Sequence, residues 1–220
     1  MLTSFTPRLD VLPATQREIW PLLKSVPRRF VLYGGTAIAL RLGHRQSVDF
    51  DFFTTDSFQV EALMEEIPWL NSAKRLQSKT NTLTVAFGKK DPVKLSFFGG
   101  LTIGRVGEPQ LTDDGTMCVA SLLDLAATKM AVIQQRAERK DYRDVAQLLN
   151  AGIGLPEALG AARALYRDTF NPMITLKALS YFRDGDLPTL PSEIQLLLSD
   201  AAKRVTTIPP IPRAAEVIAL

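Results

Sequence analysis

The chain has 220 residues, 46% of them apolar, with a formal net charge of +3 and a pI of about 9.1. This size is typical of one domain, or of one domain with a helical extension, and the single cysteine, Cys118, excludes an internal disulfide framework and fits a reducing cytoplasm. The only histidine, His44, argues against zinc hydrolases and Ser-His-Asp hydrolases, and no apolar stretch approaches about 18 residues, so we expect no membrane span.

The first half of the sequence mixes helical and strand patterns. Residues 14–26 have helical periodicity, with Thr15 and Glu18 spaced as a capping box and Pro21 placed to kink or shorten the helix. A strand that ends in a glycine turn follows at 28–35, then a short helix closed by Gly43. The alternation in 47–53 predicts a strand, 57–66 a helix, and 72–98 three strands, before a loop-rich stretch with a possible short strand at 101–105.

From about residue 116 the pattern becomes helical. Apolar residues recur at helical spacing in 121–136, 141–150, 155–167, 172–182 and 191–204, and prolines exclude a helix in the tail before Arg213. We therefore predict an α+β fold, with a small mixed sheet and its helices in residues 1–115 and a helical domain in residues 116–220.

Two acids interrupt an aromatic strand. Because side chains alternate across a strand, Asp49 and Asp51 share one face, while Phe50 and Phe52 can enter the core from the other. Like charges this close repel each other, and a divalent cation offsets the repulsion; Mg²⁺ commonly binds one or two carboxylates together with substrate phosphates. The alternative is a sheet edge that carries two solvated acids.

A glycine turn precedes the acids. Gly34 and Gly35 end a strand and Thr36 starts a helix, so backbone N–H groups at the helix start can bind phosphate oxygens. The hydroxyl of Thr36 can cap the helix and also contact a phosphate. The glycine turn and the acid pair together predict a phosphate-binding site next to a metal-binding site.

These residues resemble a known family. Gly35-Thr36, followed after twelve residues by Asp49-Phe50-Asp51-Phe52, is similar to the signature of the DNA polymerase β-like nucleotidyltransferase superfamily. The wider stretch 33–53 resembles the AbiEii/AbiGii toxin family more narrowly, with Arg45, Ser47 and Asp49 matching its approach to the acids. A second block, 122–149, is similar to the family's helical motif through Lys129, Asp141 and Asp144. The resemblance covers about residues 28–150.

The resemblance implies a polymerase β-like core followed by a helical half that completes the nucleotide cleft. Gly34, Gly35, Thr36 and Arg45 would bind the phosphates of an NTP, and Asp49 and Asp51 would hold Mg²⁺. Lys129 would lie along the nucleotide, and Asp141 would complete the catalytic set. The resemblance further implies a cytoplasmic toxin that transfers a nucleotidyl group to an acceptor hydroxyl, on a tRNA 3′ end or a protein, with a cognate antitoxin as partner.

Simpler interpretations remain open for these residues. Lys129 can be an exposed lysine of an amphipathic helix, Asp141 an N-cap, and Asp144 a local partner of Lys140 or Arg143. Arg45 can brace Asp49 instead of reaching a phosphate. Cys118 is expected to be a small buried residue. Arg136, Arg139 and Lys140 form either an RNA contact or a solvated helix end.

The sequence departs from the superfamily at one position. Its enzymes usually carry a third carboxylate on a later strand, here 93–98, where Ser96 and its neighbours are not acidic and Asp91 lies in the turn before. Either Asp141 supplies the missing base, or transfer is slow, or the chain only binds nucleotide; the helical lysine and aspartate favour the first. The alternatives in function are a nucleotide-binding or protein-interaction module and a small-molecule nucleotidyltransferase.

Overall fold

The structure is a computed structural model that describes residues 3–88 and 90–220. The chain divides into two compact units. Unit 1 contains the residues up to Gly104, together with Glu108–Ser121 and Ala215–Leu220, and unit 2 contains Arg105–Gly107 and Leu122–Ala214. Among the described residues, no helix is both long and apolar enough to cross a membrane.

Unit 1 is built on one mixed β-sheet. Within the described residues it has eight strands in the order β1-β7-β8-β2-β3-β6-β5-β4. Their bounds are β1 Ser4–Phe5, β2 Val31–Tyr33, β3 Asp49–Phe53, β4 Lys74–Lys79, β5 Thr82–Phe87, β6 Val93–Phe98, β7 Gln110–Thr112 and β8 Cys118–Val119. β3 runs parallel to β6 and antiparallel to β2. The predicted α+β class, and the strands predicted at 28–35, 47–53 and 72–98, are confirmed.

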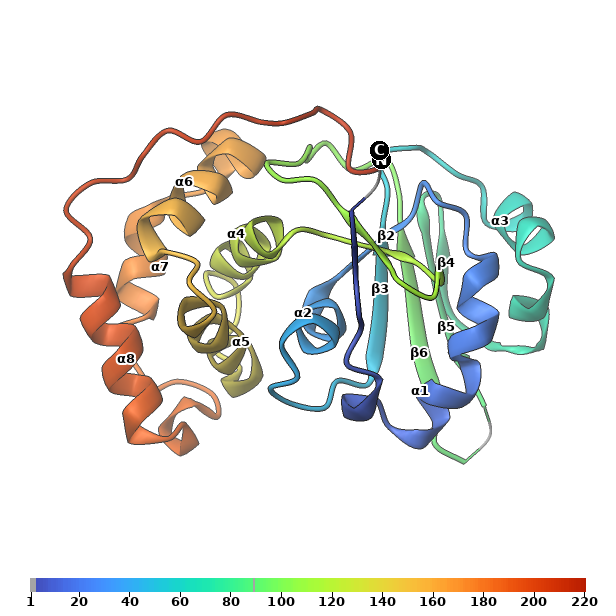
Figure 1. Cartoon of the computed structure of the whole chain (residues 1–220), viewed down its shortest axis with the longest axis horizontal. Coiled ribbons are helices and arrows are strands. Elements are labelled where there is room, and N and C mark those ends of the chain that lie inside the picture. The colour runs from blue at the N-terminus through green and yellow to red at the C-terminus, as the bar shows by residue number, and fades with distance from the viewer. Residues whose placement is uncertain (1–2, 89) are drawn as a thin grey trace. The chain divides into compact units, whose positions relative to one another are not determined.

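The core of unit 1 lies against one face of the central strands. Phe50 and Phe52 of β3 are fully buried, as predicted, and the ring of Phe52 stacks on that of Phe97 in β6 with centroids 5.1 Å apart. Helices α1 (Ala14–Ile19) and α3 (Val60–Glu66) lie on this face, and α2 (Gly34–Leu42) lies on the opposite face (Figure 1). Burial of these rings fixes β3 so that its alternate residues face α2.

Of three predictions about helix ends in unit 1, two are confirmed and one is wrong. Gly43 closes α2 with φ of 67°, a left-handed conformation that glycine adopts without a steric penalty. The predicted capping box is wrong, because α1 begins at Ala14, so Thr15 already lies inside the helix and no side chain caps it. Pro21 shortens α1 as expected: the helix ends at Ile19, and a 3₁₀ helix, Trp20–Ser25, carries the proline at its start.

Three short strands were missed and one prediction of a strand was wrong. β1, β7 and β8 have only two or three residues each, and they pair with segments far away in the sequence, such as Ser4 with Leu111. Alternation cannot be recognised over so few residues. Residues 101–105 form no strand; Arg105 makes only an isolated bridge.

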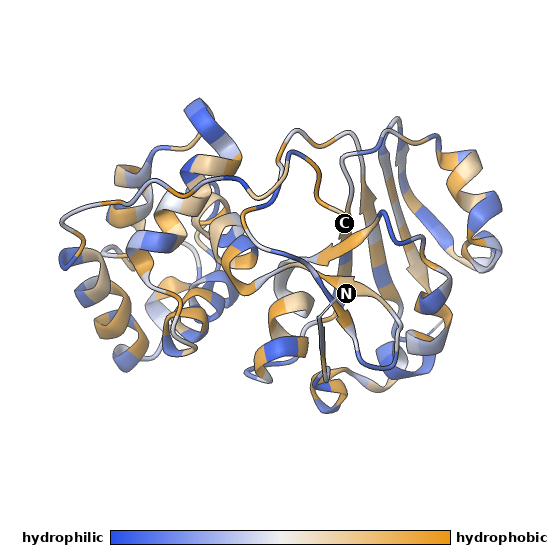
Figure 2. Cartoon of the chain, turned by 45° about the horizontal axis from the view of Figure 1, so that its top comes forward, coloured by the Kyte–Doolittle hydropathy of each residue, from blue (hydrophilic) through white to orange (hydrophobic). Residues whose placement is uncertain are grey.

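Unit 2 consists of the predicted helices. They are α4 Leu122–Val132, α5 Arg139–Asn150, α6 Leu155–Tyr166, α7 Pro172–Ala178 and α8 Ser192–Lys203. α4 packs against α5 and α6, and α8 packs against α5 and α7. Hydrophilic and hydrophobic bands alternate along these helices (Figure 2). α5 presents one apolar stripe to its neighbours, whereas α4 is buried on all sides from Asp124 to Met130.

The tail of unit 2 is held against α6 without forming a helix. The Arg213 guanidinium donates to the backbone carbonyls of Ala164 and Leu165 at 2.7 and 2.8 Å. A Cβ at Gly160 of α6 would collide with the carbonyl oxygen of Pro209, so glycine allows the close approach. These hydrogen bonds satisfy carbonyls in the last turn of α6.

Candidate functional site

The acid pair lies in the middle of the sheet of unit 1. β3 has β2 on one side and β6 on the other, so the alternative of two acids at a sheet edge is wrong. Asp49 is opposite Lys94, and Asp51 is opposite Ser96. The Asp49 carboxylate forms an ion pair with Lys94, with Oδ2 and Nζ 3.1 Å apart and both side chains partly exposed. Asp49 and Asp51 are partly exposed, in contrast to the buried rings between them.

The glycine turn meets Asp51 directly. Gly34 has φ of +75°, and a Cβ built there would lie 2.8 Å from Oδ2 of Asp51. A side chain at this position would therefore be strained and would press on the carboxylate. The missing Cβ leaves the backbone at the start of α2 next to an acidic oxygen.

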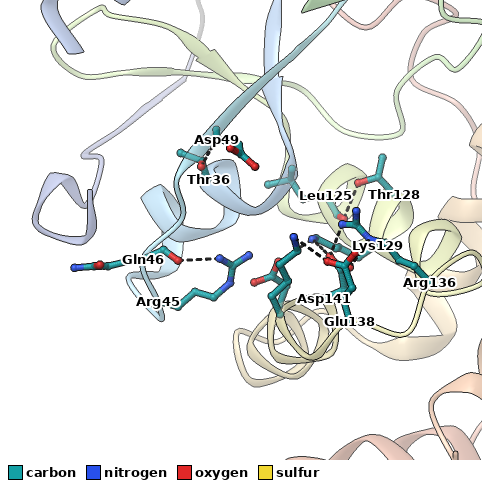
Figure 3. Close-up of polar contacts among 12 residues, drawn as sticks. Thr36, Arg45, Gln46, Asp49, Leu125, Thr128, Lys129, Arg136, Glu138 and Asp141 are labelled. Atoms are coloured by element: carbon teal, nitrogen blue, oxygen red, sulfur yellow. Dashed lines mark hydrogen bonds and ion pairs between the residues drawn. The ribbon is translucent and has the colours of Figure 1, made fainter. Parts of the chain in front are cut away.

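Arg45 lies over the second glycine. A Cβ at Gly35 would overlap Nη2 of Arg45 and would lie 3.2 Å from Oγ of Ser47. Nη1 of Arg45 donates to the carbonyl of Gln46 at 2.8 Å (Figure 3). The structure thus brings the guanidinium to the turn, where a phosphate is expected.

Thr36 joins the helix to the acidic strand. Its side chain is buried, and its hydroxyl donates to the backbone carbonyl of Asp49 (Figure 3). The expectation that Thr36 caps the helix is wrong, because α2 already begins at Gly34 and Tyr33 occupies the N-cap position. The threonine instead fixes the start of α2 against β3, next to the acid pair.

The carboxylates of Asp49 and Asp51 suit a divalent cation that takes two ligands from the protein. Within the described residues, no group of three or more His, Cys, Asp or Glu side chains is arranged to hold a metal. Two carboxylates on one face of β3 fit Mg²⁺, which takes its remaining ligands from water and substrate phosphates. Ser96 stands beside Asp51 on β6, where no third carboxylate is available.

Unit 2 contains a second set of predicted residues, joined as a buried ion cluster. Lys129 of α4 lies with Nζ 2.6 Å from Oδ1 of Asp141 and 2.8 Å from Oδ2 of Asp144, both in α5 (Figure 3 labels Lys129 and Asp141). The two aspartates are completely buried and Lys129 is nearly so. Arg136 adds two hydrogen bonds to Asp141, from Nε at 2.8 Å and from Nη2 at 3.2 Å.

This arrangement overturns three of the simpler interpretations. Lys129 is buried instead of exposed, and Asp144 pairs with Lys129, while Lys140 pairs with Glu138 at 2.8 Å. Asp141 is no N-cap, because α5 begins at Arg139 and its N-cap residue is Glu138. Lys129 and Arg136 supply positive charge to the two buried carboxylates, and Arg136 also forms an ion pair with Glu138 at 3.5 Å.

Electrostatics keep Asp141 ionised. Burial raises the pKa of its carboxyl, but the hydrogen bond from Arg136 and the charge of Lys129 outweigh burial, and the net pKa lies below the ordinary value. Burial raises the pKa of the Cys118 thiol, and the side chain is buried as predicted. Neither observation suggests a nucleophile.

The sequence pattern did not identify Lys94 or the role of Arg136. Lys94 contacts Asp49 only because of the parallel register of β3 and β6, which alternation within one strand does not determine. Arg136 was recognised as part of a basic cluster, yet its pairing with Asp141 depends on how the segment between α4 and α5 turns back.

Comparison with known proteins adds a family match and a fold match. A family model described as "Nucleotidyl transferase AbiEii toxin, Type IV TA system" matches residues 23–217. An uncharacterized protein of Aquifex aeolicus (strain VF5) is 34% identical over 162 residues, which cover 71% of this chain and 75% of that protein.

Two solved structures share the fold. A candidate nucleotidyltransferase from H. pylori superimposes with a TM-score of 0.56 at 17% identity, covering 86% of this chain and 92% of the other. MenT4, a nucleotidyltransferase toxin from Mycobacterium tuberculosis H37Rv, superimposes with a TM-score of 0.54 at 16% identity. The match covers 85% of this chain and 81% of MenT4.

Proposed function

The chain belongs to the AbiEii nucleotidyltransferase toxin family, and from that premise we propose that it transfers a nucleotidyl group from an NTP to an acceptor hydroxyl with the help of Mg²⁺. One observation carries the proposal. The turn at Gly34 and the carboxylate of Asp51 lie so close that a Cβ at Gly34 would be only 2.8 Å from Oδ2 of Asp51, too close for van der Waals contact. A triphosphate at the turn would therefore face the acids that hold its cation.

We assign the binding residues of unit 1 accordingly. The backbone N–H groups at Gly34, Gly35 and Thr36 would hold phosphate oxygens at the start of α2, and Arg45 would add its positive charge. Asp49 and Asp51 would ligate Mg²⁺. When bound, the cation would offset the charge of the phosphates and of the leaving pyrophosphate.

We propose that Lys129 and Asp141 act as a pair in this reaction. Lys129 would place its positive charge beside the nucleotide, as the family motif implies. Asp141 would position the ammonium group, to which it lies 2.6 Å away. The lowered pKa of Asp141 favours this positioning role, because a weak base is a poor proton acceptor near neutral pH. Its role as the base that replaces a carboxylate at Ser96 stays a prediction.

The acceptor and partner follow from the family alone. We propose a tRNA 3′ end as acceptor, or otherwise a protein side chain, and a cognate antitoxin made alongside this chain. We also propose that residues 1–115 form the nucleotidyltransferase core and that residues 116–220 serve it as the helical domain.

Incubation with labelled NTPs, Mg²⁺ and total tRNA tests the proposal. The chain should label RNA, and Asp51→Asn should reduce labelling about a hundredfold or more, because a metal ligand is lost. Asp91→Asn removes a nearby exposed acid of the β5–β6 turn and should leave labelling unchanged.

The alternatives predict other outcomes of the same assay. Nucleotide binding with no labelled product would favour a binding module over an enzyme. Label in a small amine or alcohol, with none in RNA or protein, would favour a small-molecule nucleotidyltransferase.

A further inference from the structure

Unit 2 contains a pocket that none of the proposed catalytic steps uses. It has a volume of about 670 Å³ and lies between the end of α4, the start of α5, α7 and the segment 180–187. That volume is in the range of sites for small organic ligands. Its walls come entirely from unit 2 and include neither the acid pair nor the glycine turn.

Hydrogen bonds fix the wall formed by α4 and α7. The Gln134 side chain donates from Nε2 to Oγ1 of Thr175 at 2.7 Å and to the carbonyl of Asn171 at 3.0 Å. Thr175 in turn donates to the carbonyl of Met130 at 3.0 Å, and it is completely buried. The end of α4 therefore holds its place beside α7 without any ligand.

The segment 180–187, which contributes further lining residues, is fixed against the start of α5 as well. The carboxylate of Asp186 accepts from the backbone N–H of Arg139 at 2.5 Å, and Nη1 of Arg139 donates to Thr189 at 3.2 Å. Gly185, with φ of +55°, packs so tightly that a Cβ would collide with the carbonyl oxygen of Ala137. A pocket with both walls fixed costs little conformational entropy on binding.

The lining combines apolar surface with both signs of charge. Tyr181 is 50% exposed and Ile174 is 47% exposed, so both offer apolar surface to an occupant of the pocket. Two cations, Arg136 and Lys177, and one acid, Asp184, line the same pocket. An occupant that matches these groups carries a flat apolar ring, an anionic group and a hydrogen-bond donor.

We propose that this pocket binds one nucleoside monophosphate unit. The base lies against Tyr181 and Ile174, the phosphate faces Lys177 and Arg136, and an exocyclic amino group of the base donates to Asp184. Stacking on an aromatic ring and pairing of phosphate with lysine and arginine are the usual means of binding a nucleotide without a metal. The unit can be a free nucleotide or one residue of an RNA strand, since both present the same chemistry.

Arg136 connects this pocket to the buried ion cluster. Its Nε and Nη2 donate to Asp141, which also binds Lys129, while its side chain remains 45% exposed. A phosphate in the pocket and the carboxylate of Asp141 would therefore share one guanidinium. The proposal itself concerns a pocket of unit 2 alone and does not depend on whether the chain transfers nucleotides.

Calorimetric titration of the full chain in EDTA tests the proposal, because a chelator suppresses metal-dependent NTP binding. The probes are AMP, adenosine and a short oligoadenylate. AMP or the oligoadenylate should bind, and adenosine should bind more weakly, because it lacks the phosphate. Lys177→Ala and Tyr181→Ala should each weaken binding about tenfold, as expected for loss of one charged contact or one stacking partner.

Matched controls exclude general effects on unit 2. Lys203→Ala removes an exposed lysine of α8, and Leu196→Ala removes an exposed apolar side chain of the same helix, so both should bind like wild type. Equal binding of AMP and oligoadenylate identifies a free nucleotide as sufficient, and binding of the oligoadenylate alone identifies RNA. The proposal is overturned if neither probe binds at about 1 mM, or if Lys177→Ala and Tyr181→Ala bind as tightly as the controls.

Discussion

Lys94 Nζ lies 3.1 Å from Oδ2 of Asp49, across the parallel pair β3 and β6. The ammonium group occupies a position near the carboxylate that the proposed Mg²⁺ would also need. A partly exposed ion pair of this kind is worth at most about 1 kcal/mol, so a divalent cation can displace it. Lys94 would then be released toward the phosphates or solvent.

Lys94→Gln therefore tests competition at Asp49. We expect the Mg²⁺ concentration for half-maximal labelling to fall about two- to fivefold, the equivalent of the weak ion pair that is removed. Lys74→Gln, in the exposed edge strand β4, serves as the control. An unchanged Mg²⁺ requirement would show that Lys94 does not compete for this carboxylate.

Gly34→Ala tests the close approach of the turn and Asp51. The substitution combines a strained φ with pressure on Oδ2 of Asp51, so both stability and NTP-dependent labelling should fall. Gly115→Ala is a matched control, because Gly115 has φ of +70° and a Cβ there would contact nothing within 4 Å. Each variant should lose roughly 1–2 kcal/mol in urea unfolding from backbone strain, but only Gly34→Ala should lose labelling. If Gly34→Ala and Gly115→Ala label the acceptor equally well, the turn at Gly34 does not take part in the reaction.

Lys129→Met tests the buried cluster. Removing the ammonium leaves Asp141 and Asp144 buried with fewer cationic partners, so the free energy of unfolding should fall by about 3–5 kcal/mol. Lys203→Met, which breaks an exposed pair with Asp200, should change it by less than about 0.5 kcal/mol. Urea titrations followed by circular dichroism measure the free energy of unfolding of each variant. Similar unfolding midpoints for the two variants would contradict a stabilising role of the buried ion cluster.

Acid should weaken unit 2 through Asp141. Its folded-state pKa lies below the unfolded value of about 3.9, so the unfolded state binds the proton more readily. The stabilisation is fully present above the unfolded pKa and is lost as the pH falls through the folded pKa. Wild type should lose stability below about pH 4, and Asp141→Asn, although less stable at pH 6, should lose less across that window. If the free energies of unfolding of wild type and Asp141→Asn fall equally as the pH is lowered, Asp141 is not the source of the acid sensitivity.

Much of the fold could be predicted because the signals were local. The alternation of Asp49 to Phe53 determines which residues are buried in β3, and the helices of unit 2 follow from apolar periodicity over ten or more residues. β1, β7 and β8 could not be found this way, because each is too short to show a period. The distant pairings of β1 with β7 and of β8 with β2 define them instead.

The sequence predicts which residues form the candidate site, and their assignment stays a prediction, but the sequence does not give their contacts. The spacing of glycines and acids placed them on adjacent elements, yet the register that puts Lys94 beside Asp49 depends on strand pairing. Lys129 stands between Thr128 and Met130 in α4, and this pattern leaves open whether the lysine is exposed. Its burial still required two acids from α5, which only the packing of the helices brings to it.

The central claim is that Asp49 and Asp51 hold a divalent cation against phosphates bound at the Gly34 turn. Crystals grown with Mn²⁺ and a non-hydrolysable NTP analogue test it most directly, through the anomalous signal of the metal. We predict a peak between the two carboxylates, with the triphosphate on the N–H groups of Gly34, Gly35 and Thr36. A nucleotide bound elsewhere, with no peak at these acids and Lys94 still paired with Asp49, would contradict the account.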